Sequence, residues 1–212
     1  MIMAFTRIPD DPFDKHFKPG TALAWLRAAG FLDAHDRAAE PLWVFGYGSL
    51  MWNPGFAHDL ALPALIRGYH RRYCVRSYRY RGTPEYPGLV LGLDRGGACW
   101  GMGFRIPVEQ VADCAEYLWY REMISAIYEP RFVPLVVKGQ RIKAVTFCVQ
   151  REHRQYFPGH DLDEVAEIIV NAVGPRGPNI DYFTQTHRHL RELKMRDPKM
   201  DALAAIIEEK QS

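Results

Sequence analysis

The sequence has few cysteines and no long hydrophobic run. Its four cysteines are widely spaced and include no Cys-x-x-Cys pair, which argues against a disulfide framework or a zinc site and favours free thiols. No run approaches the roughly 20 apolar residues that a membrane-spanning helix needs. The N-terminus carries acidic residues and lacks the apolar segment of a signal peptide. We therefore expect a cytoplasmic protein with no membrane partner.

Several signatures of binding and catalysis are absent as well. The net charge is only +2, which gives no argument for a nucleic-acid partner. His187 and His189 lie two apart in a predicted helix and point to different sides, so no metal is expected. Ser49 is not framed by the Gly-x-Ser-x-Gly motif of hydrolase nucleophiles. What is present is an ordinary globular composition, with 48% hydrophobic residues among 212, which suits one domain with extensions.

The most informative stretch is WVFGYGSL, from Trp43 to Leu50. Its apolar beginning predicts a buried strand, and the Gly-Tyr-Gly-Ser that follows predicts a turn with accessible backbone N–H groups. Successive N–H donors form a concavity that suits an anion. The stretch is not a dinucleotide fingerprint, because Met51 stands where the third glycine is required, and no Gly-Lys-Ser/Thr of a P-loop follows. A tight turn without a ligand is the alternative.

Strands are predicted in the middle of the chain. We expect one or two strands over residues 64–80, strands over 89–93 and 99–106 joined by a hairpin turn at 94–97, and a hairpin over 132–149. Glycines within these strands indicate the tight curvature of a small barrel.

Six arginines between residues 67 and 81 are interleaved with tyrosines. A basic, aromatic strand region of this kind can bind RNA. A solvated strand face, or arginines that line a pocket for an acidic ligand, is the commoner explanation. We therefore expect no nucleic-acid partner.

Helices are predicted near both ends of the chain. The expected segments are 21–29, 107–122, 162–173 with Asp161 as N-cap, 179–193 with Asn179 as cap, and a last helix from Pro198. Residues 1 to about 18 are expected to form a loose arm. The chain is thus predicted to consist of an N-terminal extension with a short helix over residues 1–40 and one domain over 41–212.

The helix after Pro107 carries a second informative residue, Glu122. Apolar residues recur at helical spacing and Glu122 continues their face, whereas Glu109 and Glu116 fall on the opposite side. A carboxylate in line with an apolar stripe is either paired with a buried cation or kept partly desolvated. Desolvation raises its pKa above the ordinary value and makes it a better base. The apolar stripe meant here is formed by Val111, Ala115 and Leu118. Both interpretations of Glu122, the ion pair and the desolvated base, fit the sequence.

Five blocks of sequence resemble the ChaC-type γ-glutamylcyclotransferases. In chain order they are VFGYGSLMWNPGF, GYHRRYCVRS, RGTPEYPGLVLGLDRGG, YLWYREM and GPRGPNIDYF. The resemblance spans about Trp43 to Leu193 and leaves the first 40 residues and the last helix outside it. It implies an α+β protein with a small mixed β-barrel and flanking helices, which acts on glutathione without a metal or organic cofactor.

The resemblance also implies roles for individual residues. Glu122 of the Arg-Glu pair would be the catalytic base, and the turn after the first strand would bind the γ-glutamyl end. The substrate's α-amine would attack its own γ-carbonyl, which releases 5-oxoproline and Cys-Gly. The turn N–H groups would hold either a substrate carboxylate or the oxyanion. The substrate-binding residues expected on this basis are Gly46, Tyr47, Gly48, Ser49, Leu50, Met51, Arg76 and Tyr182, of which Tyr47 and Tyr182 are also compatible with simple packing.

Three alternatives accompany this prediction. The first is a cyclotransferase for other γ-glutamyl amino acids or amines, and the second is a non-enzymatic ligand-binding or cation-transport regulatory module on the same barrel. The third is RNA binding through the region of arginines and tyrosines. Glu85, in the Pro-rich loop, is the rival carboxylate, either solvated or gating the pocket. We expect a monomer or a weak homodimer.

Overall fold

A computed structural model describes residues 20–211, and five of its strands close into a barrel. The strand order is β1-β3-β2-β4-β5; the β1–β5 pair is parallel and the other pairs are antiparallel. This confirms the expected α+β fold with a small mixed barrel. The strands are β1 (Leu42–Gly46), β2 (Leu60–Ser77), β3 (Gly88–Ile106), β4 (Tyr128–Val137) and β5 (Gln140–Val149).

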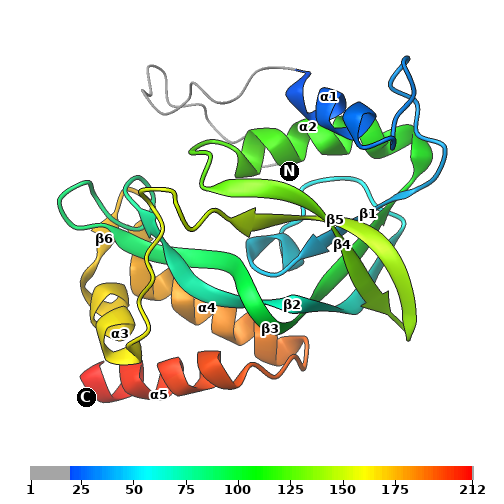
Figure 1. Cartoon of the computed structure of the whole chain (residues 1–212). Helices are drawn as coiled ribbons and strands as arrows, with labels where there is room; N and C mark the ends of the chain where they lie inside the picture. Colours follow the sequence, from blue (N-terminus) through cyan, green and yellow to red (C-terminus); the bar gives the residue numbers. More distant parts are fainter. Residues whose placement is uncertain (1–19, 212) are drawn as a thin grey trace.

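Within residues 20–211, five α-helices flank the barrel on two sides. Figure 1 shows α1 and α2 together on one side, and α3, α4 and α5 on the opposite side. The helices are α1 (Thr21–Ala28), α2 (Val111–Glu122), α3 (Leu162–Asn171), α4 (Asn179–Glu192) and α5 (Pro198–Gln211). Short elements complete the chain: 3₁₀ turns η2 (Ser49–Met51) and η3 (Val108–Gln110), and two-residue strands β6 (Val173–Gly174) and β7 (Gly177–Pro178).

Strand β3 differs most from the sequence prediction. The hairpin turn expected at 94–97 is wrong, because these residues continue β3 and stay beside β2, with Asp94 opposite His70. The ladder shifts register at this point, where Gly68 and Gly96 both have positive φ. Glycine adopts this conformation without steric cost, so both strands bend sharply and neither ends.

Several element ends also differ from prediction. Strands β2 and β4 begin earlier than expected, at Leu60 and Tyr128, because these residues pair with the far ends of β3 and β5. Pro107 precedes a 3₁₀ turn, so the α-helix itself starts at Val111. Val173 is not helical but exposed in β6. Local pattern alone misplaces such ends because cross-strand pairing decides them.

The core lies inside the barrel and under the helices. Phe45, Phe104 and Phe147 are among its fully buried side chains. Burying one such side chain stabilises the fold by about 1.5–3 kcal/mol. All four cysteines are buried free thiols, as predicted.

Helix α1 packs against the barrel side that carries α2. The Trp25 ring stacks on Phe132 with centroids 4.8 Å apart and lies 5.2 Å from Trp119.

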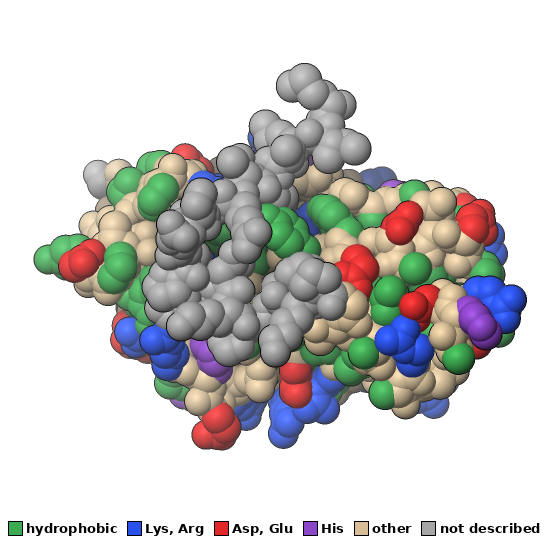
Figure 2. Space-filling view, turned by 90° about the horizontal axis from the view of Figure 1, so that it is seen from above, with side chains coloured by type: hydrophobic (Ala, Val, Ile, Leu, Met, Phe, Trp, Pro, Cys, Tyr) green, Lys and Arg blue, Asp and Glu red, His purple; other side chains and the backbone are tan. Residues whose placement is uncertain are grey.

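Acidic and basic side chains are interspersed on the face seen in Figure 2. The arm expected over residues 1–18 lies outside the described residues, and the division of the chain at residue 40 stays a prediction. Among residues 20–211 the structure has no helix long and apolar enough to cross a membrane.

Asn179 ties the start of α4 to β3. Its fully buried side chain accepts a hydrogen bond from the Leu89 N–H (2.6 Å) and donates one to the Leu89 carbonyl (2.8 Å). The prediction that Asn179 caps its helix is therefore wrong, because both ends of its amide are used by the strand. Asp161 does cap α3, by accepting from the Asp163 N–H at 2.9 Å.

Candidate active site

A cavity of about 500 Å³ opens at one end of the barrel. Its walls come from the Gly-rich turn after β1, the end of β2, the end of α2, the start of β4, and α4. The volume lies within the usual range of about 300–1,000 Å³ for sites that hold small molecules. The cavity is rich in cationic side chains: Arg76, Arg79, Arg81, Arg121 and Arg176 all line it.

Glu122 is the sole acid among the lining residues in the described part of the chain. It is the last residue of α2, and its side chain is 15% exposed. The helical spacing correctly predicted that this carboxylate continues the buried face of α2, and the structure shows that it lies in a cavity wall. The rival carboxylate, Glu85, is exposed and is not among the lining residues.

The Gly-rich turn forms the wall next to Glu122. Tyr47, Gly48, Ser49 and Leu50 line the cavity, whereas Gly46 and Met51 do not. The substrate-binding role expected for these six residues stays a prediction. A Cβ on Gly46 would lie 2.9 Å from the Leu50 Cβ, so a glycine is needed for the chain to turn this tightly. Met51 is buried behind the turn.

Arg71 supports the turn from behind. This buried guanidinium donates to the Tyr47 carbonyl at 2.8 Å and contacts the Met51 sulfur at 3.8 Å. Its Nε lies 2.8 Å from the Asp197 carboxylate, which directly precedes α5. A fourth group, the Trp100 carbonyl of β3, accepts from Nη2. The turn is thus anchored to both β3 and the beginning of the last helix.

Arg121 joins the turn to α2 from the cavity side. Its guanidinium donates to the Ser49 hydroxyl at 2.9 Å and to the Asn53 carbonyl at 2.6 Å. Its Nε lies 3.4 Å from the Glu122 carboxylate. Sequence reasoning missed this role, although the signal was present, since Arg121 is adjacent to Glu122 in the same motif.

Burial raises the pKa of Glu122 above its ordinary value of 4.5, and the neighbouring charge of Arg121 opposes this shift. Burial also raises the pKa of Tyr182 to about 12 and shifts the pKa values of Tyr47 and Tyr128 well above 10. The three phenols therefore stay protonated at neutral pH, and their hydroxyls are able to donate hydrogen bonds.

Tyr182 reaches the cavity from the first turn of α4. Its ring lies 5.7 Å from the Arg81 guanidinium, which in turn donates to the Arg176 carbonyl (2.8 Å) and the Pro178 carbonyl (3.1 Å). Arg81 therefore fixes the β6–β7 hairpin beside the aromatic wall. Tyr128, which sequence reasoning missed, lines the same cavity from the start of β4 and donates to the Leu91 carbonyl at 2.8 Å.

Arg76 lines the cavity from β2, and its guanidinium lies 5.2 Å from the centre of the Phe157 ring. Its neighbours in the arginine-rich segment differ in their surroundings. Arg71 is buried in the support of the turn, and Arg72 pairs with Asp94 at 3.4 Å. Of the interpretations offered for this segment, a pocket for an acidic ligand is the one that Arg76, Arg79 and Arg81 fit.

Metal ligands do not converge in the part of the chain that the structure describes. Within residues 20–211, no group of three or more His, Cys, Asp and Glu side chains could hold a metal ion. The chemistry available in the cavity is that of one partly desolvated carboxylate, several phenols, backbone amides and guanidinium groups. Such a set suits proton transfer on a substrate that itself carries negative charge.

Comparison with known proteins shows the family. The sequence pattern of the ChaC-like proteins matches residues 42–210. The glutathione-specific γ-glutamylcyclotransferase of Escherichia coli is 34% identical over 168 residues, which cover 79% of this chain and 73% of that protein. The enzyme of the same name from Schizosaccharomyces pombe is 37% identical over 174 residues, 72% of this chain and 84% of the relative.

The fold is shared with a solved structure of the same kind. The crystal structure of a γ-glutamyl cyclotransferase specific to glutathione from yeast superposes with a TM-score of 0.72 at 22% identity, and covers 80% of this chain and 96% of the other. This structural likeness shows that the fold is shared, and the sequence matches show the family. The resemblance inferred from five blocks of sequence is therefore confirmed, and the chain belongs to the ChaC-like family.

Proposed function

We propose that the protein cleaves glutathione to 5-oxoproline and Cys-Gly as a γ-glutamylcyclotransferase. The relatives named for this activity support the proposal. The observation that carries it is Glu122, a largely buried carboxylate beside the Gly-rich turn in a cavity that is otherwise lined by arginines. Glutathione carries two carboxylates and one ammonium group, which complements this distribution of charge.

The protein has to supply a base but no nucleophile, because the attacking amine belongs to the substrate. The substrate's α-ammonium first gives a proton to the Glu122 carboxylate. The free amine then attacks the γ-carbonyl carbon, a C–N bond closes the five-membered lactam, and the amide bond to cysteine breaks. Glu122 returns its proton to the leaving nitrogen, and the second proton that the attacking nitrogen loses as the lactam forms goes to solvent, so Cys-Gly departs as an amine. Such proton transfer typically contributes about 10²–10⁴-fold in rate.

Orientation supplies the larger part of the acceleration. Holding an amine and a carbonyl of one molecule in reacting geometry is worth up to about 7–11 kcal/mol. The backbone N–H groups of Gly48 and Ser49 belong to the wall next to Glu122 and suit negative charge on the γ-glutamyl end. Tyr47 and Tyr182 line the same cavity, and their hydroxyls are protonated.

A direct assay tests this function. Purified protein is incubated with glutathione, and 5-oxoproline and Cys-Gly are measured by mass spectrometry. We expect both products in equal amounts. Glutathione left intact would refute the activity, and faster turnover of γ-glutamyl-alanine than of glutathione would favour the broader cyclotransferase.

Arg76 is expected to recognise the glycine carboxylate of glutathione. Arg76→Met should raise the KM for glutathione by about 10–100-fold, because a hydrogen bond to a charged group contributes about 1.5–3 kcal/mol. Steady-state kinetics check this. The matched comparison is glutathione amide, which lacks that carboxylate and should lose little affinity in the variant. Equal losses for both substrates would remove Arg76 from this role.

The pH dependence of kcat/KM should report the Glu122 proton. Because burial raises its pKa above 4.5, the carboxylate becomes a base only above this raised value, and activity rises with pH through it. Arg121→Met removes the charge that lowers this pKa, so the acidic limb should move to higher pH. The control is Arg131→Met, at a half-buried pair with Glu129 outside the cavity lining. An unchanged limb in Arg121→Met would contradict the assignment.

A further inference from the structure

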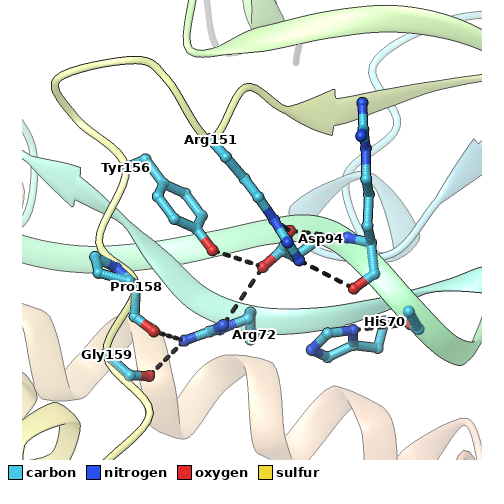
Figure 3. Close-up of polar contacts among 9 residues, drawn as sticks. His70, Arg72, Asp94, Arg151, Tyr156, Pro158 and Gly159 are labelled. Carbon is cyan, nitrogen blue, oxygen red and sulfur yellow. Dashed lines mark hydrogen bonds and ion pairs between the residues drawn. The ribbon is translucent and has the colours of Figure 1, made fainter.

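Asp94 is a buried carboxylate at the bend of β3, outside the cavity lining. Its side chain is fully buried and has four partners (Figure 3). Oδ1 accepts from the Arg151 Nε at 2.7 Å and from the Arg95 N–H at 2.8 Å. Oδ2 accepts from the Tyr156 hydroxyl at 2.9 Å and lies 3.4 Å from the Arg72 guanidinium. Burial alone would raise the pKa of Asp94, but hydrogen bonds from Arg151 and Tyr156 leave it below 3.8, so the group is charged at neutral pH.

The partners of Asp94 hold one particular segment, residues 150–160, which connects β5 to α3. Arg151 lies near its beginning and Tyr156 in its middle. Arg72 secures its end, because Nη2 donates to the carbonyls of Pro158 (2.5 Å) and Gly159. Figure 3 shows these side chains converging on Asp94 from the segment and from β2.

The same segment runs along β2 toward the cavity. The Phe157 N–H donates to the Cys74 carbonyl at 2.9 Å. The Arg76 N–H donates to the Gln155 carbonyl at 2.8 Å, and the Gln155 side chain donates back to the Arg76 carbonyl at 2.9 Å. Both Gln155 and Arg76 line the cavity. The backbone that carries Arg76 is therefore held by a segment whose other attachments lead to Asp94.

We propose that Asp94 is a positioning residue that holds segment 150–160 against β2 and thereby fixes Arg76 and Gln155 in the cavity wall. The inference rests on the proposed function for its kinetic readout. Replacing Asp94 by Asn keeps the shape of the side chain but leaves Arg72 and Arg151 without their anion. Arg151 is 47% exposed and can turn to water, which releases the beginning of the segment.

Two measurements on Asp94→Asn test the proposal. We expect the KM for glutathione to rise about tenfold with kcat within a factor of about two, the change expected when one charged hydrogen bond to substrate is weakened. We also expect faster amide hydrogen exchange at Arg76 and Phe157, but not at the β1–β3 ladder. The control is Asp59→Asn, which removes an exposed pair with Arg105 and should change neither quantity.

Each other outcome is decisive. Exchange that stays unchanged at Arg76, or accelerates equally throughout the barrel, overturns the proposal, and so does faster local exchange with an unchanged KM. If Asp94→Asn does not fold, Tyr156→Phe removes one of the four contacts and should give a smaller change in the same direction; no change there overturns the proposal. Absence of glutathione cleavage by the wild type would refute the proposed function instead, independently of the exchange result.

Discussion

Glu122→Gln is expected to lower the turnover of glutathione by about 10²–10⁴-fold. Glutamine has nearly the same shape as glutamate, so the packing at the end of α2 is kept. Its amide cannot accept the proton of the substrate's ammonium group, and the amine then cannot attack. Release of 5-oxoproline measures the effect. Glu109→Gln, at an exposed position before α2, is the matched control and should retain full activity.

The same variant is expected to be at least as stable as the wild type at neutral pH. Because the pKa of Glu122 is raised in the folded state, folding binds a proton more tightly, and wild-type stability falls as pH rises from 4.5 through the raised value. Glutamine does not ionise, so the variant does not lose stability in this way as pH rises. The difference in Tm between variant and wild type should therefore be larger at pH 7 than at pH 4. Near wild-type turnover would refute Glu122 as the base, whatever the stability.

Arg71→Met is expected to reduce the free energy of unfolding by about 3–5 kcal/mol, the cost of breaking a buried ion pair by removing one partner. The Arg71 side chain is 1% exposed, and the substitution leaves Asp197 without its cation and the Tyr47 carbonyl without its donor. Urea denaturation measures the loss. Activity should fall as well, because Tyr47 belongs to the turn that lines the cavity.

A second substitution separates charge from packing. Replacing both partners, in Arg71→Met/Asp197→Leu, should recover part of the lost stability, because no charge is then left unpaired. The matched single variant is Arg105→Met, whose pair with Asp59 is exposed and is worth about 0–1 kcal/mol. A loss in Arg71→Met no larger than in Arg105→Met would show that the buried pair does not support the turn.

The residues that sequence reasoning placed well are those set by local pattern. The inward position of Glu122 follows from helical spacing over a single helix, and the turn at Gly48 follows from two glycines after an apolar run. The resemblance then joined the two, which spacing alone does not do. The Asp161 cap is likewise a local signal.

The residues that were missed or misplaced depend on contacts between distant segments. The bend at Asp94 looks like a turn in the sequence, because a loop and a glycine-bent strand share the same composition; only pairing with β2 distinguishes them. Asn179 looks like a cap until Leu89, 90 residues earlier, takes both ends of its amide. Tyr128 reaches the cavity only once β4 is placed in the barrel. No local window contains this information.

The contact between Arg71 and Asp197 also has a consequence for the order in which the protein matures. The turn after β1 is synthesised early, and so is Arg71 of β2, which supports it. This buried guanidinium receives its counterion only when the stretch before α5 has been synthesised. A nascent chain that already contains the whole barrel therefore still lacks the Arg71–Asp197 ion pair. Catalytic competence should arise late in translation, so that an incomplete polypeptide does not consume its substrate.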